Sequence, residues 1–475
     1  MTQPWLRAPE LDFARVRDEL GLTAEFGPEA LAEAGAAADR HADRRTDRRD
    51  LELVTIDPPT SLDLDQALRV RRDDDGYLVH YAIADVAALV TPGGALDAET
   101  RRRGATIYFP DGNVPLHPRV LSENAGSLLP EVDRAAVLWT VRVAGDGEVL
   151  ETSVERATVR SRARFDYAQV AADAAADRLH PSITGLPGFG AAREEWGLGR
   201  GAVALELPDQ EVVRNEDPGR RRAWTLRLAP STPADRWNAQ VSLLVGMCAG
   251  TLMRAGGIGF YRTLPAASDE AVGELRAVAD RLGVPWPEGA SPGRFLAGLD
   301  PAAPSTLALM SAGASLMRGA GYRAVFSGDD VPDAELVHAG VGGLYAHVTA
   351  PLRRLADRYA TEIALALSAG TTPEPWVLDA LPGLGKIMSG AGSTASSAAR
   401  RSVDLAEATV LADQIGARFP ATVMRAANER RPAQVFIASP AIIAPCDDAP
   451  DAGSECTAEV AVADPEAGTV GFTAV

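Results

Sequence analysis

The chain has 475 residues and a formal net charge of −18 at pH 7. Apolar residues make up 46% of it and charged residues 24%, which is ordinary for a globular protein and excludes wholesale disorder. The length predicts roughly two to four domains with a large core. The acidic balance excludes a uniformly basic nucleic-acid coat protein, although it leaves room for a local basic groove.

The sequence indicates a reducing compartment and no membrane contact. Three cysteines, Cys248, Cys446 and Cys456, are too few for a disulfide framework and are not spaced as zinc ligands. The first residues, MTQPWLRAPELDF, lack the basic and then apolar pattern of a secretory signal. The longest apolar stretch, 241–253, is too short to span a bilayer. We therefore expect a cytoplasmic protein.

Residues 1–49 are predicted to be helical and polar. Pro28 can open a helix that carries Leu31 and Ala34, and the charged run HADRRTDRRD follows at 41–50. One alternative for this region is a small unit of helix-turn-helix type, for which there is no firm signature.

Strand signals begin at 51–56, and two hairpins follow. In the first, ALRVRR and YLVHYAI flank the turn DDDG at 73–76. In the second, VLWTVRV and EVLETSV flank the turn AGDG, within 137–154. The alternation of apolar residues in these segments predicts strands with one face in a core.

Two long helices are expected further along the chain. Thr232 can cap a helix that begins at Pro233 and ends at the pair Gly256-Gly257. A similar helix is expected from Pro351 to Gly370. Between this second helix and the tail, the Gly/Ser-rich stretch 382–399 is interpreted as either flexible or tightly packed against a ligand.

The tail, 413–475, returns to short strand-like runs separated by turn residues, which fits a small barrel of OB type. It carries four arginines against nine acidic residues, a net charge of −5. That is a poor electrostatic footprint for RNA. The whole chain is therefore predicted to be a multidomain α+β protein with a helical start and a C-terminal β-barrel.

The first motif that could carry chemistry is TIDPPTSLDLDQAL at 55–68. It returns Asp63 and Asp65 within eight residues of Asp57. Three carboxylates this close repel one another unless a cation binds between them, and Mg²⁺ prefers such oxygen ligands. In phosphoryl chemistry these metals activate water and stabilise the attacking and leaving oxygens. The alternative is a solvated acidic loop, which a chain this acidic supplies readily.

The second motif is YAHVTAPLRRLADRY at 345–359. With Pro351 as the first helical residue, Arg353 and Arg354 would fall in the first helical turn. Cations there oppose the helix dipole unless an anion docks, and guanidinium groups beside free backbone N–H groups make a phosphate clamp. The alternative is that both arginines pair with nearby carboxylates.

The third motif is RRRGATIYFPDGNVPLHPRVLS at 101–122. A basic run precedes Tyr108 and Phe109 in a loop bounded by proline and glycine. Aromatic rings beside arginines suit single-stranded nucleic acid, because every base offers a face for stacking. The alternative is that both rings belong to the core.

Together and in this order, the three motifs resemble the ribonuclease II/R family of exoribonucleases over about 50–410. The stretches 83–122, 344–357 and 400–408 are similar to consecutive blocks of that family's catalytic domain. The resemblance implies an RNB-type catalytic domain at 50–410 and an OB-fold RNA-binding-type barrel at 413–475. The helical region 1–49 would stand in place of the cold-shock barrels that usually precede the catalytic domain.

The resemblance implies a metal-dependent hydrolytic 3′-to-5′ exoribonuclease. Its partner would be single-stranded RNA with a free 3′ end, and its products nucleoside 5′-monophosphates and a short end product. The implied cofactor is Mg²⁺, with Mn²⁺ as an alternative, and the implied state is a monomer. Phosphate contacts need only a basic channel, and arginines cluster at 101–103, 160–164, 220–222, 353–354 and 400–401.

The resemblance also implies roles for the residues of the acidic motif. Asp57 would be a metal ligand, Asp63 would belong to the same acidic shell, and Asp65 would be the catalytic aspartate. Gln66 stands where the family has a fourth aspartate. Its carbonyl could still ligate a metal, but without charge, so metal affinity should fall.

Further residues are implied to bind RNA. Arg353 would contact the scissile phosphate and offset charge in the transition state, with Arg354 beside it. Tyr108 would stack against the terminal bases. The other residues implied to contact RNA are Tyr345, His347 and Glu407.

Two rival interpretations stay open at this point. The first is a catalytically weakened family member that binds RNA without cutting it, and Gln66 motivates it. The second is a non-enzymatic interaction scaffold whose acidic loop is merely solvated.

Overall fold

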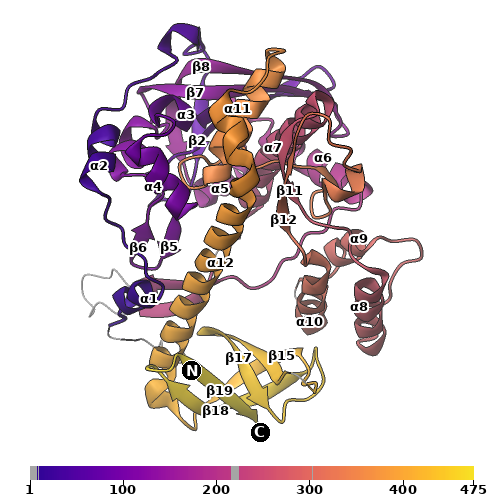
Figure 1. The fold of residues 1–475 in the computed structure, drawn as a ribbon. Coiled ribbons are helices and arrows are strands. Elements are labelled where there is room, and N and C mark those ends of the chain that lie inside the picture. Colours follow the sequence, from indigo (N-terminus) through magenta and orange to yellow (C-terminus); the bar gives the residue numbers. More distant parts are fainter. Residues whose placement is uncertain (1–7, 9, 215–223, 230, 302, 430) are drawn as a thin grey trace.

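The structure is a computed structural model that describes every residue except 1–7, 9, 215–223, 230, 302 and 430. Figure 1 shows an upper body built around strands, a long helix that runs down from it, and a small barrel at the lower end of that helix. None of the described helices is long and apolar enough to cross a membrane.

A closed circuit of hydrogen-bonded strands forms the centre of the upper body. The strand order is β1-β8-β2-β3-β4-β7, and β7 also pairs with β8. Both predicted hairpins are confirmed, because β3 pairs with β4 and β7 with β8, each antiparallel. The strands are β1 (Thr46–Asp47), β2 (Leu53–Ile56), β3 (Gln66–Asp73), β4 (Gly76–Ala84), β7 (Asp133–Val143) and β8 (Val149–Phe165).

Alternate residues of these strands enter two separate cores, as the two-residue period of a strand requires. Val79 and Trp139 face a large core shared with the helices α7 and α11. Ala82 and Leu138, on the opposite face of the same strands, face a smaller core that also contains Leu352. The sheet is therefore covered on both sides.

Helices of the upper body pack on these faces. The predicted helix after Thr232 is confirmed as α7: Thr232 and Asp235 form a capping box, and Gly257 ends the helix at φ +68°. The helices are α3 (Val86–Leu89), α4 (Ala95–Arg103), α5 (Tyr167–Ala175), α6 (Leu186–Gly199), α7 (Pro233–Gly256) and α11 (Leu355–Ser368).

Four short antiparallel pairs and a helical lobe complete this part of the chain. The pairs are β5 (Ile107–Phe109) with β6 (Gly112–Val114), β9 (Gln210–Arg214) with β10 (Trp224–Leu228), β11 (Gly259–Thr263) with β12 (Gly321–Val325), and β13 (Val337–His338) with β14 (Gly343–Leu344). The lobe consists of α8 (Asp269–Arg281), α9 (Pro292–Ala297) and α10 (Pro304–Gly313). It has its own small core, and α10 packs against the barrel strand β15.

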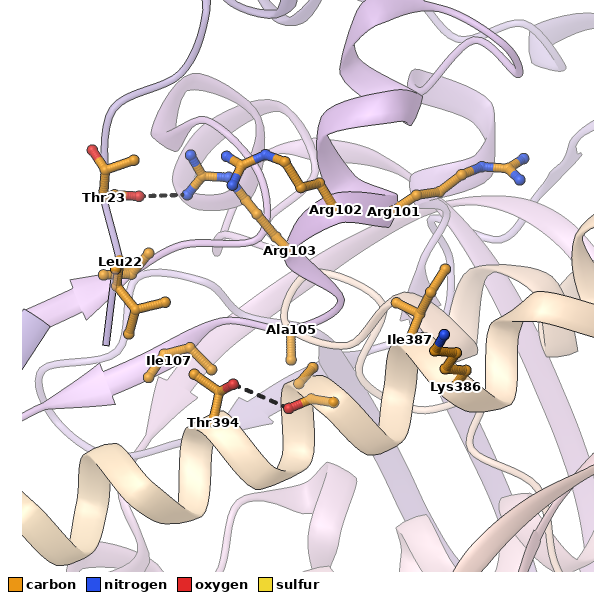
Figure 2. A pocket seen from close by; sticks show the side chains of 14 residues that line it. Leu22, Thr23, Arg101, Arg102, Arg103, Ala105, Ile107, Lys386, Ile387 and Thr394 are labelled. Atoms are coloured by element: carbon orange, nitrogen blue, oxygen red, sulfur yellow. Dashed lines mark hydrogen bonds between the residues drawn. The ribbon is translucent and has the colours of Figure 1, made fainter. Parts of the chain in front are cut away.

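The long helix α12 (Pro375–Leu411) joins the body to the barrel (Figure 1). Its 37 residues make it about 55 Å long. It includes the stretch 382–399, which is therefore helical. Small residues let neighbours approach this helix: a Cβ at Gly104 would lie 2.8 Å from that of Ala391. Thr394 of α12 lies beside Ile107 of β5 (Figure 2), and a Cβ at Gly104 would lie 3.1 Å from Cγ2 of Ile387.

The C-terminal strands form a closed five-stranded barrel in the order β15-β16-β17-β19-β18, which confirms the predicted barrel. Its core includes Phe419, Val435, Ile442 and Phe472. The strands are β15 (Arg418–Arg425), β16 (Ala433–Ala438), β17 (Ala441–Asp447), β18 (Glu455–Asp464) and β19 (Thr469–Ala474).

Two short helices precede the sheet, α1 (Phe13–Glu19) and α2 (Pro28–Gly35). The second begins at Pro28, as predicted. They pack against different partners, α1 on α12 and α2 on α4. The ring of Phe13 meets that of Trp224 edge-on at 5.2 Å, which joins α1 to the start of β10. The two helices therefore do not form a helix-turn-helix unit.

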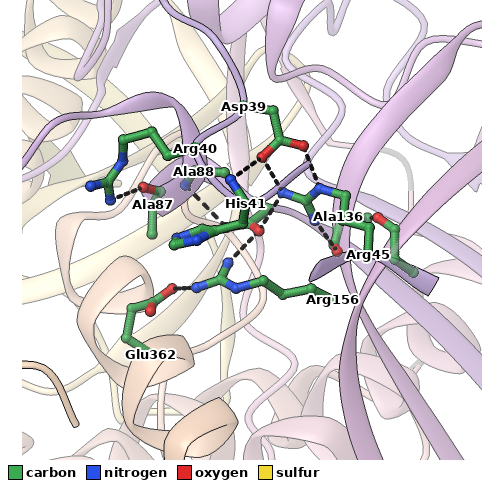
Figure 3. Close-up of polar contacts among 11 residues, drawn as sticks. Asp39, Arg40, His41, Arg45, Ala87, Ala88, Ala136, Arg156 and Glu362 are labelled. Carbon is green, nitrogen blue, oxygen red and sulfur yellow. Dashed lines mark hydrogen bonds and ion pairs between the residues drawn. The ribbon is translucent and has the colours of Figure 1, made fainter. Parts of the chain in front are cut away.

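A buried network of ion pairs fixes the segment after α2 to the body (Figure 3). Arg45 pairs with Asp39 at 2.5 Å and with Asp85 at 2.8 Å. Arg156 of β8 pairs with the same Asp85 and with Glu362 of α11 at 2.5 Å. Removing one partner of such a network leaves an uncompensated buried charge, which typically costs about 3–5 kcal/mol. The segment is thus an integral part of the fold.

Glu407 ties the end of α12 to the barrel. Its side chain is 4% exposed and accepts hydrogen bonds from the N–H of Ile443 at 2.9 Å and from Nε2 of Gln210 at 2.6 Å. Gln210 also donates to the carbonyl of Ala441 at 2.9 Å. Burial raises the pKa of Glu407 to about 7. The carboxyl group therefore links α12 to β9 and β17. Because it is buried, its ionised form lowers the stability of the folded state.

We predict that Glu407→Gln changes the pH dependence of stability. An acid whose pKa rises on folding leaves the native state with more bound protons, so stability falls as pH rises through that window and then levels off. For Glu407 the window runs from about 4.5 to about 7. The amide has no such cost, so the variant should gain about 2 kcal/mol relative to the wild type between pH 5 and pH 7.5.

Urea unfolding at these two pH values measures the gain. Glu270→Gln, at an exposed position of α8, is the matched control and should show the same difference from wild type at both pH values. A Glu407→Gln difference that is equally independent of pH would contradict the buried charge.

Candidate active site

Asp65 brings the first two motifs together. Its carboxylate is buried, with Oδ1 accepting the N–H of Leu352 at 2.7 Å and Oδ2 accepting Nε of Arg353 at 3.2 Å. These partners lie 287 and 288 residues further along the chain. Burial raises the pKa of Asp65 to about 8, and the charge of Arg353 opposes that rise.

Local packing holds Asp65 in this position. The preceding residue, Leu64, is fully buried in the same core as Leu352. Its N–H donates to Oγ of Ser127 at 3.0 Å, and that hydroxyl donates to the carbonyl of Leu62 at 2.7 Å. The loop between β2 and β3 is therefore fixed from both sides.

Asp57 lies at the other end of this loop, directly after β2. Its Oδ2 is buried and has no hydrogen-bond partner among the described residues. Burial raises the pKa of Asp57 to about 6, Arg164 and Arg353 oppose this, and Asp63 adds to it. Arg164 donates to the carbonyls of the two prolines that follow Asp57, at 3.1 and 2.6 Å, and so holds the turn in place.

Asp63 completes the acidic group and contacts the third motif. Its Oδ2 accepts the hydroxyl of Tyr108 at 3.1 Å. The Tyr108 side chain lies on β5 and is 49% exposed, so its ring is available beside the carboxylates. All three sequence motifs thus meet at one place.

The three carboxylates offer the oxygen ligands that a hard cation prefers, but their side chains do not converge on one point. Among the residues that the structure describes, no three histidine, cysteine, aspartate or glutamate side chains gather closely enough to hold a metal. However, Asp63 raises the pKa of both Asp57 and Asp65, so the three charges lie close together. The unpartnered oxygen of Asp57 is one that a cation would satisfy, and oxygen donors match Mg²⁺.

Gln66 makes a second link between β3 and the arginine-bearing loop. Its Nε2 donates to the carbonyl of Thr349. The amide nitrogen is therefore committed, and only Oε1 is left for a ligand. Whether Gln66 ligates a metal stays a prediction, but its observed contact is structural.

The helix expected from Pro351 is wrong at its start, because α11 begins at Leu355. Two backbone N–H groups between Pro351 and Leu355 donate to acceptors outside this segment. That of Leu352 goes to Asp65, and that of Leu355 goes to the carbonyl of Gly104 at 3.0 Å. Arg353 and Arg354 therefore precede the helix and do not occupy its first turn.

The two arginines have different environments. Arg353 is 49% exposed beside Asp65, which leaves part of its guanidinium free for a ligand. Arg354 makes two contacts with Asp357, at 2.5 and 2.7 Å, and the same carboxylate accepts the N–H of Ala350. Arg354 is therefore committed to an ion pair within the fold.

The two remaining residues of this motif are less accessible than the sequence suggested. Tyr345 is buried against α7, where a Cβ at Gly246 would come 2.1 Å from its ring. Nδ1 of His347 is hydrogen bonded to the hydroxyl of Tyr322 at 2.8 Å, and burial lowers the pKa of His347 well below its usual range. The sequence analysis missed Tyr322, which no local pattern distinguishes from a core residue.

The structure does not bring Glu407 to the acidic group, because its carboxylate is held at the junction with the barrel. Of the predicted arginine clusters, 220–222 lies outside the described residues. Arg160 and Arg401 pair with Asp133 and Glu19. Beside the carboxylates, Arg353 has a side chain that is 49% exposed.

Comparisons with known proteins agree with this geometry. A family model described as the RNB domain matches residues 45–367, and one described as the RNase II-type exonuclease C-terminal S1 domain matches 417–475. The chain belongs to the RNB family. Ribonuclease R from Vibrio parahaemolyticus is 27% identical over 356 residues, which are 69% of this chain but 40% of that relative's length.

Solved structures show the same fold. RNase R from Mycoplasma genitalium, in complex with ribose methylated single-stranded RNA, has a TM-score of 0.85 at 18% identity, over 98% of this chain and 77% of that one. Yeast Ssd1, described as a pseudonuclease, has a TM-score of 0.66 at 14% identity, over 85% of this chain and 50% of that one. The fold thus occurs with and without nuclease activity.

We predict that replacing the two arginines by alanine has different effects on stability. Arg354→Ala leaves the fully buried Asp357 without its cation, which should lower the free energy of unfolding by about 3–5 kcal/mol. Arg353→Ala should cost only about 1 kcal/mol, because Arg353 is half exposed and Asp65 keeps the N–H of Leu352. Urea unfolding at pH 7.5 measures both values. A larger loss for Arg353→Ala would refute the assignment.

We also predict that Gln66→Glu is destabilising. A carboxylate at this position would face the carbonyl of Thr349 with no proton to donate, so the hydrogen bond is lost and two acceptors repel each other. The free energy of unfolding should fall by about 1–3 kcal/mol. The control is Gln169→Glu, at an exposed position of α5, which should change stability by less than about 0.5 kcal/mol. Equal stability of the two variants would mean that the Gln66 contact is unimportant.

Proposed function

We propose that this RNB-family protein hydrolyses single-stranded RNA from a free 3′ end, acting as a cytoplasmic monomer. The products would be nucleoside 5′-monophosphates and a short end product. The observation that supports this most is the meeting of Asp57, Asp63 and Asp65 with Arg353 and Tyr108, from three distant parts of the chain. Such a group offers oxygen ligands, a cation for phosphate and a ring for a base.

We assign a separate role to each residue of this group. Asp57 and Asp63 would hold Mg²⁺ or Mn²⁺, since Oδ2 of Asp57 is buried without a partner among the described residues and Asp63 uses Oδ2 for Tyr108. The bound metal would supply activation of the attacking water and offset phosphate charge. Arg353 would bind the scissile phosphate through its exposed face. Tyr108 would stack on a terminal base.

Asp65 would act on the attacking water. Burial raises the pKa of Asp65 to about 8, so its carboxylate, once ionised, is a stronger base than an exposed aspartate and can accept a proton from water. The N–H of Leu352 and the Arg353 guanidinium fix its orientation. The nearby charges of Arg353 and a bound metal favour the ionised form in which it can accept that proton.

A second candidate function is RNA binding without cleavage. Gln66 favours it, because a neutral amide tied to Thr349 occupies the position after Asp65. The fold occurs in a pseudonuclease as well. Turnover separates the two candidates directly.

We predict that Asp65→Asn abolishes hydrolysis while binding is retained. The amide keeps the shape of the side chain and one acceptor for the N–H of Leu352, but it cannot accept a proton from water. Cleavage of 5′-labelled single-stranded RNA in Mg²⁺ should fall at least about a thousandfold, roughly 4 kcal/mol in the barrier. RNA affinity, measured by fluorescence anisotropy, should stay within a few-fold of wild type.

Three controls accompany this test. The wild type in EDTA should be inactive, and Asp280→Asn, at an exposed position of α8, should be fully active. A circular RNA of the same sequence should not be cut, since it offers no 3′ end. Cleavage of the circle would refute exonucleolytic action, and an inactive wild type that binds RNA would favour the second candidate.

A further inference from the structure

A cavity of about 360 Å³ lies on the opposite side of β5 from the acidic residues. Ile107 lines this cavity, whereas the next residue, Tyr108, reaches Asp63. Successive side chains of a strand point to opposite faces, so one strand separates the two sites. Figure 2 shows the cavity between the loop at Leu22 and Thr23, the end of α4, and α12.

The cavity is lined by positive charge. Arg101, Arg102 and Arg103 come from the end of α4, and Lys386 comes from α12. None of the lining residues that the structure describes is acidic. In a chain with a net charge of −18, a cavity with four cations and no carboxylate in its wall is complementary to an anion.

Nearby carboxylates offset only part of this charge. Asp97 pairs with Arg101, and Glu99 pairs with both Arg102 and Arg103. Lys386 takes part in no ion pair within the described part of the chain, and it is the one lysine among 47 basic residues. The Arg102 side chain is 60% exposed. Lys386 and Arg102 are therefore the cations with free surface.

The rest of the cavity wall includes a fixed arginine side chain and small residues of α12. Arg103 is fixed by the carbonyls of Thr23 and Pro115, each at 3.0 Å, and its guanidinium lies 3.8 Å from the ring centre of Phe26. On α12, Gly390 and Thr394 leave space beside the helix backbone. The cations are thus presented around an already formed space.

We propose that this cavity is a second anion site that binds a phosphate ester of nucleotide size. Its volume is at the lower end of the range for small-ligand sites, roughly 300–1,000 Å³. Lysine and arginine side chains from two elements can donate charge-assisted hydrogen bonds to one phosphate group. The phosphate could belong to a free mononucleotide or to an RNA chain, and the same cations would bind either.

The site adjoins the acidic group through the backbone. Ala105, in the cavity wall, pairs with Arg354, and the N–H of Thr106 donates to the carbonyl of Arg353 at 2.9 Å. A ligand in the cavity would therefore contact the strand that positions Arg353 and Tyr108. The proposal itself needs only binding, so it stands or falls independently of hydrolysis.

Calorimetric titration with adenosine 5′-monophosphate in EDTA tests the proposal. The wild type should bind the nucleotide at one site, and adenosine without phosphate should bind far more weakly. The double variant with Lys386→Glu and Arg102→Glu should lose at least about tenfold in affinity. Arg353→Ala removes the cation proposed to bind phosphate on the acidic side of the strand, so nucleotide binding that persists in this variant is assigned to the cavity.

Arg178→Glu is the matched charge reversal, since Arg178 is 70% exposed and pairs with Asp173 outside the cavity. It should leave nucleotide affinity unchanged, and Lys386→Arg should retain it. Thermal unfolding checks that the double variant is folded. Unchanged affinity in a folded double variant, or equal losses in Arg178→Glu, would overturn the proposal.

Two further arms distinguish the sources of the phosphate. If RNA of ten nucleotides loses affinity for the double variant by the same factor as the nucleotide, an RNA phosphate occupies the cavity. If only the nucleotide loses affinity, the ligand is a free mononucleotide. Both outcomes support a phosphate site. If the double variant keeps its affinity for both the nucleotide and the RNA, the proposal is refuted.

Discussion

The buried carboxylate of Asp65 is the constraint on which the active region depends. A charge with this little access to water needs hydrogen-bonded partners, and Asp65 finds them 287 and 288 residues away. Meeting that requirement fixes the loop before α11 against the start of β3. Leu64 and Leu352, each next to one end of the contact, share a core, so apolar burial supports the polar link. The site is therefore held by the same interactions that hold the domain together.

The position of α11 follows from this contact. In a helix from Pro351 the N–H of Leu355 would bond to the carbonyl of Pro351, but it donates to Gly104 instead, so the regular helix begins only at Leu355. Arg354 then pairs with Asp357, and Arg353 is left at the surface. The pairing of Ala105 with Arg354 places β5 alongside, so that the next exposed ring on that strand is beside the acidic residues. One buried charge thus determines which cation and which ring face the substrate side.

The sequence predicted those parts of the fold that local patterns determine. Alternating apolar residues identified the two hairpins, Thr232 and Gly257 marked the limits of α7, and turn residues separated the barrel strands. It also brought Asp57, Asp63 and Asp65 into one candidate site. It could not predict the start of α11, because the competing acceptor, the carbonyl of Gly104, belongs to a distant part of the chain. The stretch 382–399 was misread for a similar reason: packing against β5, not propensity, makes Gly/Ser-rich sequence helical there.

The charge and the contacts of the C-terminal barrel indicate a structural role. Its net charge of −5 would repel a phosphate backbone. The barrel matches a family model named after S1 domains. A barrel of this type often binds nucleic acid, so the fold alone would suggest that function. Its firm contacts are instead with the rest of the chain, through Glu407 and Gln210 at β17 and through α10 at β15. The described contacts therefore give the barrel a part in bracing α12, and in the functions proposed above it is the body that would bind phosphate.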